Sequence, residues 1–326
     1  MLSAGGGNQY NKNMASTHGF PLKLQFSGHE TFPLRQLWLR KAFYAVEEVN
    51  GDVAASKKLF AEDAAIRRFG VGKNMVAAIR HWALACDVIR EGNAGAVDVG
   101  PIGQLLFGKG GVDPYLERPA TCWLVHWLLA GRALRSTTWY WMFNRLTQQT
   151  FDRASVVLGL EGLAQERQAR VSPTTLKRDI EVCLRCYLPR QDGRESDDAY
   201  EPILVDIGLI SEGPTGTFQF RRGQQQTLPD ALFAFALLEF WKRWEARTGS
   251  SQMTLSFEVI AHDYGSPGRV FKLDENSVAE RLMNLETISK GVLRWTDSAG
   301  VRQVSRHENA CDDAYLHELL RRSYEH

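Results

Sequence analysis

The pattern of apolar and polar residues is clearest between residues 65 and 89, where it predicts two helices joined by a tight turn. Apolar residues recur there every three or four positions, the spacing of one buried helix face: Val76, Ile79, Trp82 or Ala83, and Cys86. Before them, residues 70–72 (Gly-Val-Gly) predict a turn, because glycine adopts left-handed backbone angles at little cost. After them, residues 87–90 and 97–99 flank a turn-rich segment and predict a β-hairpin. This order of elements is typical of a winged helix.

Four polar residues of the second helix lie outside or beside its apolar stripe: Lys73, Asn74, Arg80 and His81. A DNA-recognition helix needs this arrangement, because apolar residues seat the helix while Lys, Asn and Arg near its start reach bases and phosphates. We therefore predict that this helix binds DNA. The alternative interpretation is a plain helical hairpin within a protein core.

Two later segments repeat the pattern of a helix followed by a hairpin. In residues 171–190, Ser172 predicts a helix cap and Pro173 the first helical position. The first turns of this helix hold four candidate DNA contacts: Thr174, Thr175, Lys177 and Arg178. A hairpin is expected across residues 209–220, and residues 274–288 predict another helix with a third hairpin around residues 297–300.

These patterns together predict a mainly α fold with small β-hairpins, in which multiple winged-helix-like units are joined by a helical middle. Residues 1–20 are rich in Gly, Asn and Ser and are expected to form a disordered tail. The expected units are an N-terminal winged-helix-like DNA-binding domain, a helical domain with a second helix-plus-wing unit, and a C-terminal winged-helix-like domain. Their expected bounds are residues 21–112, 113–226 and 227–326.

The helical middle is rich in aromatic residues. Residues 121–129 predict a buried helix that ends at Gly131, and residues 137–148 predict another. The aromatic residues could form a stacking platform for single-stranded nucleic acid, but at helical spacing they favour a core. His126, between two tryptophans, is interpreted as a core histidine. Cys183 and Cys186 are interpreted as a buried apolar pair rather than as a zinc or redox site.

Residues 26–32 (FSGHETF) precede a segment with helical spacing. Pro33 fits the first turn of that helix, and Thr31 is a candidate cap. His29 and Glu30 occupy the loop. One interpretation is that both side chains anchor the loop by hydrogen bonds; the other is a functional loop with a titratable histidine beside a carboxylate.

Charge is distributed unevenly along the chain of 326 residues. Residues 1–190 hold 24 Lys and Arg against 16 Asp and Glu, whereas residues 191–326 hold 15 against 22. The basic part suits a polyanion, and the acidic part suits a protein partner or metal ions. Five cysteines favour a reduced, cytoplasmic setting over secretion, and no apolar run is long enough to span a membrane.

Several motifs together resemble a bacterial family of unknown function. They are FSGHETF, LRQLWLRKAF, GVGKNMV, IRHWALA, TTWYWMFN and SPTTLKRDIEV. The family is encoded in DNA phosphorothioation and related phage-defence islands, and one branch comprises the SspB nickase components of single-strand phosphorothioation systems. The resemblance, which covers residues from about 26 to beyond 285, implies DNA binding and partners from the same operon. Those partners include sulfurtransferase or ATP-pyrophosphatase-like proteins and ATPases. No catalytic residue is transferred by motif.

The resemblance leads to the hypothesis of a metal-dependent DNA nickase that opens one strand for sulfur insertion. Mg²⁺ or Mn²⁺ would be the cofactor, although no known nuclease signature identifies its ligands. The candidate site is the FSGHETF loop, with His29 as base or metal ligand, Glu30 as carboxylate ligand and Arg35 as phosphate clamp. Asp179 and Glu181 are two residues apart on a helix, so at most one of them could join this site. The alternative is a non-catalytic DNA-binding or scaffold subunit that recruits a sulfur-transfer enzyme or an ATPase.

Overall fold

The structure is a computed structural model that describes residues 23–49, 51–189, 202–307 and 312–325. It is mainly helical with three small antiparallel sheets, as the sequence predicts. The expected tail, residues 1–20, lies outside the described residues. Among the described helices, none is both long and apolar enough to cross a bilayer.

The N-terminal part contains the predicted helix, turn, helix and hairpin. Its elements are α2 (Gln36–Glu48), α3 (Val53–Lys58), α4 (Glu62–Phe69), α5 (Lys73–Ala85), β1 (Ile89–Glu91), β2 (Val97–Val99) and α6 (Pro101–Phe107). Gly70 ends α4 in the left-handed conformation, with φ 64°, which agrees with the turn predicted at residues 70–72. Strands β1 and β2 pair antiparallel, with Ile89 opposite Val99.

The middle part is built on a second small sheet. Its elements are α7 (Pro119–His126), a π-helix (Trp127–Arg132), α8 (Thr137–Asn144), β3 (Thr150–Asp152), α9 (Arg153–Glu166), α10 (Pro173–Tyr187), β4 (Ile210–Glu212) and β5 (Thr217–Phe220). The Ser172 hydroxyl caps α10 by accepting from the backbone N–H of Thr175, and Pro173 is its first residue, as predicted. Strand β3, which pairs with β5 and extends the β4–β5 hairpin to three strands, has no counterpart among the predicted elements.

The C-terminal part holds the third sheet. Its elements are α11 (Asp230–Thr248), β6 (Thr254–Ser256), α12 (Phe257–His262), α13 (Pro267–Val270), α14 (Glu275–Met283), α15 (Leu285–Ile288), β7 (Leu293–Ser298), β8 (Val301–Arg306) and α16 (Asp313–Arg322). The predicted hairpin around residues 297–300 is present. Ala299 (φ 52°) and Gly300 (φ 81°) form its turn, and two positive φ values suit a two-residue hairpin loop.

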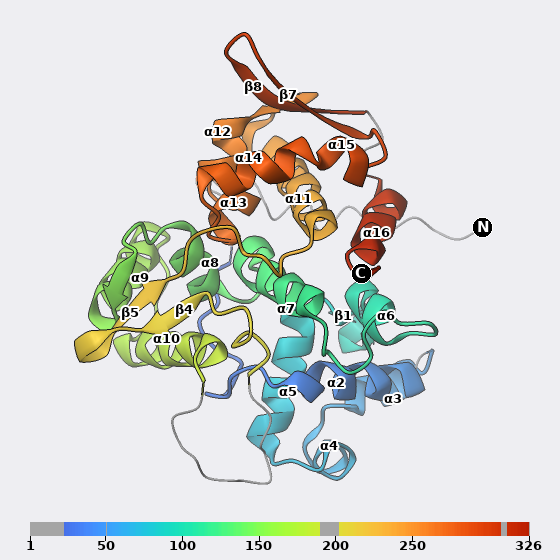
Figure 1. The fold of residues 1–326 in the computed structure, drawn as a ribbon. Coiled ribbons are helices and arrows are strands. Elements are labelled where there is room, and N and C mark those ends of the chain that lie inside the picture. Colours follow the sequence, from blue (N-terminus) through green and yellow to red (C-terminus); the bar gives the residue numbers. More distant parts are fainter. Residues whose placement is uncertain (1–22, 50, 190–201, 308–311, 326) are drawn as a thin grey trace.

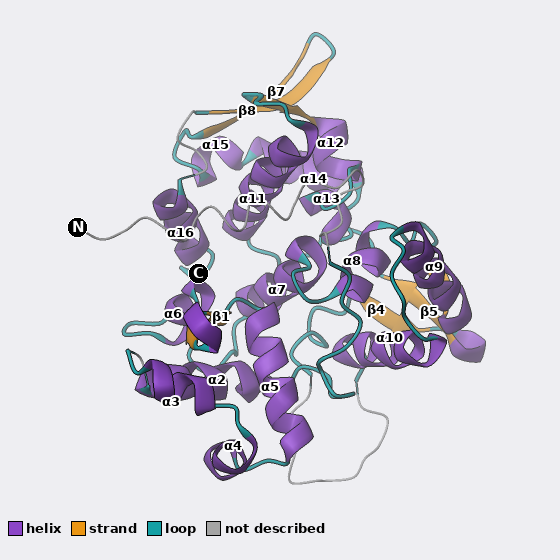
Figure 2. Ribbon diagram, turned by 180° about the vertical axis from the view of Figure 1, so that it is seen from behind, coloured by secondary structure: helices purple, strands orange, loops and turns teal. Residues whose placement is uncertain are grey.

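The middle and C-terminal parts follow a similar order of elements, to which the C-terminal part adds the four-residue helices α13 and α15. In the middle part α8, β3, α9 and α10 precede the β4–β5 hairpin, and in the C-terminal part α11, β6, α12 and α14 precede the β7–β8 hairpin. In both sheets the first strand pairs with the last, giving the orders β3-β5-β4 and β6-β8-β7. The two parts lie on different sides of α7, which is central in both views (Figure 1 and Figure 2).

Several predicted helix boundaries are wrong. The helix predicted for residues 137–148 ends at Asn144, and the one predicted for residues 274–288 is divided at Asn284 into α14 and α15. The helix after the FSGHETF loop begins at Gln36, because Arg35 is still extended and Thr31 has φ 66°, so neither Pro33 nor Thr31 starts it. The helix predicted for residues 121–129 does not end at Gly131. It widens into a π-helix and ends at Ala133, which takes the left-handed conformation with φ 53°. Such a π segment is uncommon and recurs at functional sites.

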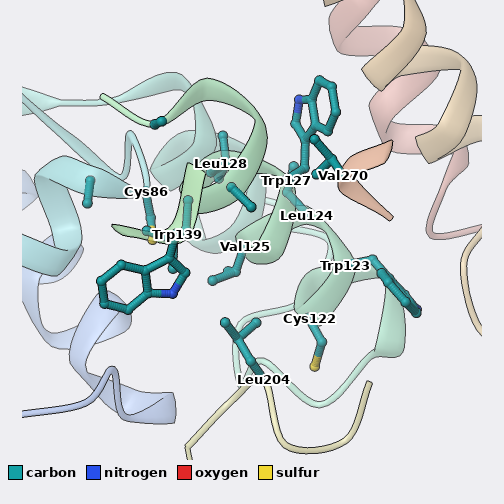
Figure 3. Packing of buried hydrophobic residues seen from close by; sticks show 14 of the residues in the cluster. Cys86, Cys122, Trp123, Leu124, Val125, Trp127, Leu128, Trp139, Leu204 and Val270 are labelled. Carbon is teal, nitrogen blue, oxygen red and sulfur yellow. The ribbon is translucent and has the colours of Figure 1, made fainter. Parts of the chain in front are cut away.

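The buried apolar side chains form one continuous cluster from Phe26 to Tyr324. Figure 3 shows its centre, where Trp123, Trp127 and Trp139 pack around α7. These tryptophans are at most 1 % exposed, which confirms the core interpretation over an exposed stacking platform. Cys183 and Cys186 are free and buried, as expected.

His126 is also a core residue, as predicted. Its Nε2 donates to the Val270 carbonyl at 2.9 Å, so Nδ1 accepts from the Tyr187 hydroxyl at 2.8 Å. Burial lowers the pKa of His126 to about 3, although the Val270 carbonyl opposes this shift; nearby Lys272 adds to it. The ring is therefore neutral at neutral pH, and its hydrogen bond to Val270 connects the middle part to the C-terminal part.

Candidate functional site

The FSGHETF loop is held between the two helices that the sequence singles out as DNA-reading candidates. On one side, the indole N–H of Trp82 in α5 donates to the Phe32 carbonyl at 3.1 Å. On the other side, Arg185 of α10 donates to the Thr31 carbonyl at 3.1 Å. Gly28 (φ 115°) and Glu30 (φ 47°) both have positive φ angles. Glycine adopts such angles easily, but a glutamate does not, so the contacts of the loop must hold Glu30 in this conformation.

His29 is buried, with 4 % of its surface exposed, and both ring nitrogens have partners. Nδ1 accepts from the backbone N–H of Thr31 at 3.2 Å, so Nε2 carries the proton and donates to Asp179 Oδ1 at 2.6 Å. The other oxygen of Asp179 accepts from the Thr138 hydroxyl. Of the two acidic residues considered on α10, Asp179 therefore faces the loop, while Glu181 forms an ion pair with Arg153 at 2.9 Å.

His81 lies inside the protein, beside the same loop. It is 6 % exposed, and its ring centroid is 5.7 Å from that of His29. A side chain at Gly28 would put a Cβ 2.6 Å from His81 Nδ1, so glycine is required there for space as well as for φ. Burial lowers the pKa of His81 to about 3, with further lowering by His29, Arg135 and Arg80. The sequence placed His81 outside or beside the apolar stripe, whereas its ring faces the interior.

The three residues proposed for catalysis have three different environments. His29 is buried, whereas Glu30 is exposed to solvent. Arg35 is half-buried, with its guanidinium carbon 5.1 Å from the centre of the Trp38 ring and 5.9 Å from that of Phe32. Both ring nitrogens of His29 are occupied by Thr31 and Asp179, not by Glu30 or Arg35.

The described residues contain no cluster of three potential protein ligands for a metal ion. Within residues 23–49, 51–189, 202–307 and 312–325, no three His, Cys, Asp or Glu side chains gather closely enough to hold a metal ion. Mg²⁺ takes oxygen ligands, with carboxylates among them.

The start of α5 is exposed, and its second half is not. Lys73 and Asn74 face solvent, in line with the sequence prediction for the first turn of a reading helix. Arg80, seven residues after Lys73 on α5, is half-buried, and its guanidinium lies 3.5 Å from the Glu91 carboxylate in strand β1. Arg135 also pairs with Glu91, at 2.9 Å. Of the four predicted contacts on α5, Lys73 and Asn74 are thus the two exposed to solvent.

The start of α10 presents a second polar surface. Thr174, Lys177 and Arg178 are exposed, while Thr175 is half-buried with its hydroxyl 2.9 Å from that of Ser172. Asp179 follows Lys177 and Arg178 in the sequence, but its side chain faces inward, so its carboxylate is not part of this surface. Lys177 and Arg178 therefore form a basic pair at the N-terminal end of a helix, an arrangement that suits contacts with phosphate.

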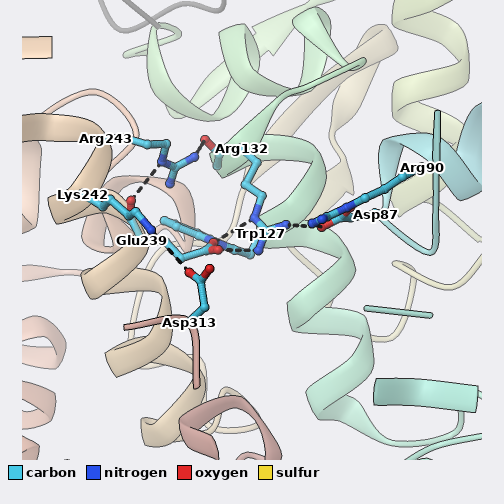
Figure 4. A network of polar contacts seen from close by, with 9 residues as sticks. Asp87, Arg90, Trp127, Arg132, Glu239, Lys242, Arg243 and Asp313 are labelled. Atoms are coloured by element: carbon cyan, nitrogen blue, oxygen red, sulfur yellow. Dashed lines mark hydrogen bonds and ion pairs between the residues drawn. The ribbon is translucent and has the colours of Figure 1, made fainter. Parts of the chain in front are cut away.

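A buried charge network joins the three parts of the chain (Figure 4). Arg132, in the π-helix, donates from Nη1 to Asp87 at 3.0 Å and from Nε to Glu239 at 2.9 Å. Glu239, on α11, also accepts from the Trp127 indole at 2.7 Å. Asp87 binds Arg90 as well, with Nε 2.5 Å from Oδ1. The sequence gives no sign of this network, because its members are far apart along the chain.

Sequence comparison assigns the chain to a class of protein. It belongs to the family described as protein of unknown function DUF4007, which matches residues 26–324. No curated protein matches the chain.

Solved structures narrow the similarity further. The chain is similar to a crystal structure of SspB, with 26 % identity over 97 % of this chain and 91 % of that one, at a TM-score of 0.78. It also shares its fold with a magnesium-ion-bound SspB crystal structure, with 23 % identity over 93 % of this chain and 97 % of the other, at a TM-score of 0.75.

Proposed function

We propose that the protein is a DNA-binding component of a bacterial DNA phosphorothioation or related phage-defence system. The observation that carries the proposal is the similarity to SspB along nearly the whole chain. The motifs from FSGHETF to SPTTLKRDIEV support it, because they resemble a family encoded in such systems. The exposed polar starts of α5 and α10 support DNA as the ligand.

The proposed DNA-binding units are winged-helix-like. What supports this is the order of elements shared by the middle and C-terminal parts, together with the sheet orders β3-β5-β4 and β6-β8-β7. In such a unit the helix before the hairpin is the one that enters a DNA groove. That helix is α5 in the N-terminal part and α10 in the middle part.

Salt-dependent binding of a DNA duplex tests the proposal. We expect affinity to fall steeply with salt, because Lys and Arg side chains that bind phosphate release counterions. Replacing Lys73, Lys177 and Arg178 with Ala should weaken binding and lower the slope of log K against log salt by about one unit for each phosphate-binding side chain removed. The matched control replaces three exposed basic residues of the acidic part: Lys242, Lys290 and Arg294. Equal affinity of both triple variants would contradict the proposal.

Metal-dependent nicking stays a prediction from the resemblance. The test is incubation of the purified protein with supercoiled plasmid in the presence of Mg²⁺ or Mn²⁺. An open-circular product that EDTA prevents would support a nickase. Intact plasmid, together with salt-dependent binding, would support the alternative of a DNA-binding subunit that recruits a sulfur-transfer enzyme or an ATPase.

We further propose that the acidic residues 191–326 bind a partner protein of the same system. The support is charge alone, 22 Asp and Glu against 15 Lys and Arg. Exposed acidic side chains on the C-terminal helices include Glu258, Glu275, Glu280 and Glu286. Capture of operon proteins by the full-length chain should decrease when these four residues are replaced by Lys. Undiminished capture would contradict this docking surface.

A further inference from the structure

One face of α2 carries an arginine held against a neighbouring loop. Gln36, Arg40 and Tyr44 are spaced by four residues and therefore share this face. Gln36 Nε2 donates to the carbonyls of Tyr115 at 3.0 Å and Leu116 at 3.1 Å. The Tyr44 hydroxyl donates to the Phe107 carbonyl at 3.4 Å. Helix α2 thus holds both the end of α6 and the loop between α6 and α7, and Tyr115 is positioned beside Arg40.

The Arg40 guanidinium interacts with two exposed aromatic rings. Its carbon is 4.5 Å from the centre of the Tyr115 ring and 5.4 Å from that of the Tyr44 ring. Tyr115 is 54 % exposed and Tyr44 is 41 % exposed, whereas the tryptophans of the core are buried. We call these three residues the Tyr44–Arg40–Tyr115 stack. It presents aromatic surface and positive charge to solvent at the same place.

The positive charge of Arg40 can interact with a negatively charged ligand. Arg40 forms no ion pair with any carboxylate in the described part of the chain, and its buried Nε makes no hydrogen bond there. The next residue, Lys41, is exposed, with its Nζ 3.4 Å from the Phe69 carbonyl. An arginine between tyrosines, with no carboxylate beside it, suits a ligand that combines a planar ring with a negative charge.

We propose that the Tyr44–Arg40–Tyr115 stack binds single-stranded DNA. A base stacks on the Tyr115 ring, and the Arg40 guanidinium pairs with a neighbouring phosphate. Proteins that bind single strands combine stacking rings with basic side chains in this way. In a duplex both faces of each base are already stacked on neighbouring bases, so the stack selects an unpaired strand. The inference rests on the proposed DNA-binding function and adds a second form of DNA to it.

The experiment compares a fluorescent oligonucleotide of about 12 nucleotides, a length within the usual range of single-strand sites, with the same sequence as a duplex. Tyr115→Ala should weaken single-strand binding about five- to hundredfold, the range measured for loss of one stacked base, and leave duplex binding unchanged. Tyr115→Phe keeps the ring and should bind as the wild type does. Arg40→Ala should weaken single-strand binding and lower its salt slope by about 0.7.

Tyr264→Ala is the matched control. Tyr264 is another exposed tyrosine, at 37 %, but its ring has the guanidinium of Arg145 at 5.5 Å and that of Arg269 at 4.8 Å. Tyr264 lies in the loop between α12 and α13, outside the Tyr44–Arg40–Tyr115 stack, so this variant should bind single strands as the wild type does.

The following results would overturn the proposal. The first is single-strand binding by Tyr115→Ala at wild-type affinity, and the second is a Tyr115→Phe variant as weak as Tyr115→Ala. The third is a wild type that binds the duplex but not the single strand, which would leave the proposed DNA-binding function standing. A wild type that binds neither form of DNA would overturn both. Capture of an acidic peptide with no single-strand binding would likewise contradict the proposal and indicate a protein partner instead.

Discussion

The chemistry open to His29 depends on its two hydrogen bonds. Both ring nitrogens are occupied, by Thr31 and Asp179, and the ring is 4 % exposed. A base or metal ligand needs a free nitrogen that reaches the substrate. In the described geometry His29 instead fixes the FSGHETF loop between α5 and α10. Catalysis by His29 would require the loop to move and one of these bonds to break.

We expect His29→Ala to lower the melting temperature, because the substitution leaves the buried Asp179 carboxylate without one of its two donors. The cost should be about 1–3 kcal/mol, the range for an unsatisfied buried polar group. Glu30→Gln, at an exposed position, should change stability by less than about 0.5 kcal/mol. Thermal melting checks both values.

Plasmid nicking by the same two variants separates a structural role from a catalytic one. Activity lost with unchanged melting would support catalysis by the loop. Activity lost only together with a lower melting temperature would support the anchoring interpretation. Nicking retained in both variants would place the chemistry elsewhere.

The buried histidines give stability a defined pH dependence. His81 and His126 each have a pKa near 3 when folded, because burial disfavours the charged ring. In the unfolded chain a histidine binds a proton near pH 6.5, so below that value the unfolded state takes up protons that the folded state does not. Stability should therefore fall as the pH decreases from about 6.5, by up to about 1.4 kcal/mol per pH unit for each histidine.

Urea unfolding at several values between about pH 5 and pH 7 measures this slope. The His81→Asn variant should show a smaller slope than the wild type, whatever its stability at neutral pH, because one of the two histidines with a lowered pKa no longer titrates. An unchanged slope would show that His81 does not contribute in this way.

At the scale of elements, the packing of α9 against α8 depends on a single glycine. A Cβ at Gly159 would lie 2.0 Å from Cζ2 of Trp141, whose ring is buried. One turn further along the same helix, a Cβ at Gly162 would meet nothing within 4 Å. The two glycines therefore differ in packing although both lie inside one helix.

We expect Gly159→Ala to destabilise the protein by about 1–3 kcal/mol, because the new methyl group displaces Trp141 or the helix. Gly162→Ala should stabilise it by about 0.5–1 kcal/mol, because alanine loses less backbone entropy in a helix. Chemical denaturation of both variants measures the two effects. Destabilisation by Gly162→Ala of the same size as that by Gly159→Ala would contradict this packing.

Elements with a strong local pattern could be predicted from the sequence, and those that depend on distant partners could not. Helices α5 and α10 follow from apolar spacing and caps, and the β7–β8 hairpin from its turn residues. Strands β3 and β6 have three residues each, too few to show alternation. What defines β3 is pairing with β5, where Thr150 lies opposite Gln219.

The same limit applies to the candidate site. The FSGHETF loop stands out in the sequence, but His29 and Asp179 are 150 positions apart, so no spacing connects them. Asp179 could be considered only as one of two acids on a helix. Likewise, the interaction of Tyr115 with Arg40 depends on how a loop folds back onto α2, which apolar periodicity does not encode.

At the scale of the whole molecule, the three parts share one core and one charge network. Trp127 of the middle part packs against Phe271 of the C-terminal part, with ring centroids 5.5 Å apart, and its indole donates to Glu239. A chain that ended at residue 226 would expose this surface. Partner docking by the acidic part is therefore best tested with substitutions in the full-length protein rather than with a truncation.

Arg132 is the residue that connects all three parts, so its removal is the sharpest test of this arrangement. Burial by itself would raise the pKa of Glu239, but the charge and hydrogen bonds of Arg132, with help from Arg243 and Trp127, hold it below its ordinary value. Because the folded pKa is depressed, Glu239 contributes stability above about pH 4.5, and this contribution is lost as the pH falls through the folded value.

Arg132→Ala should cost about 3 kcal/mol at neutral pH, the lower end of the range for a broken buried pair, because the Arg132 side chain is 17 % exposed. The control Arg294→Ala breaks an exposed pair with Glu286 and should cost less than about 1 kcal/mol. The difference in the free energy of unfolding between the wild type and Arg132→Ala should become smaller between about pH 7 and pH 4. Without Arg132 the pKa of Glu239 is higher than in the wild type, so as the pH falls the carboxyl of the variant takes up a proton first and no longer buries a charge. Below about pH 4.5 the wild type loses the stabilisation from ionised Glu239 as well. Denaturant unfolding across this pH range measures the difference, and a gap that stays constant would show that Glu239 is not held ionised by Arg132.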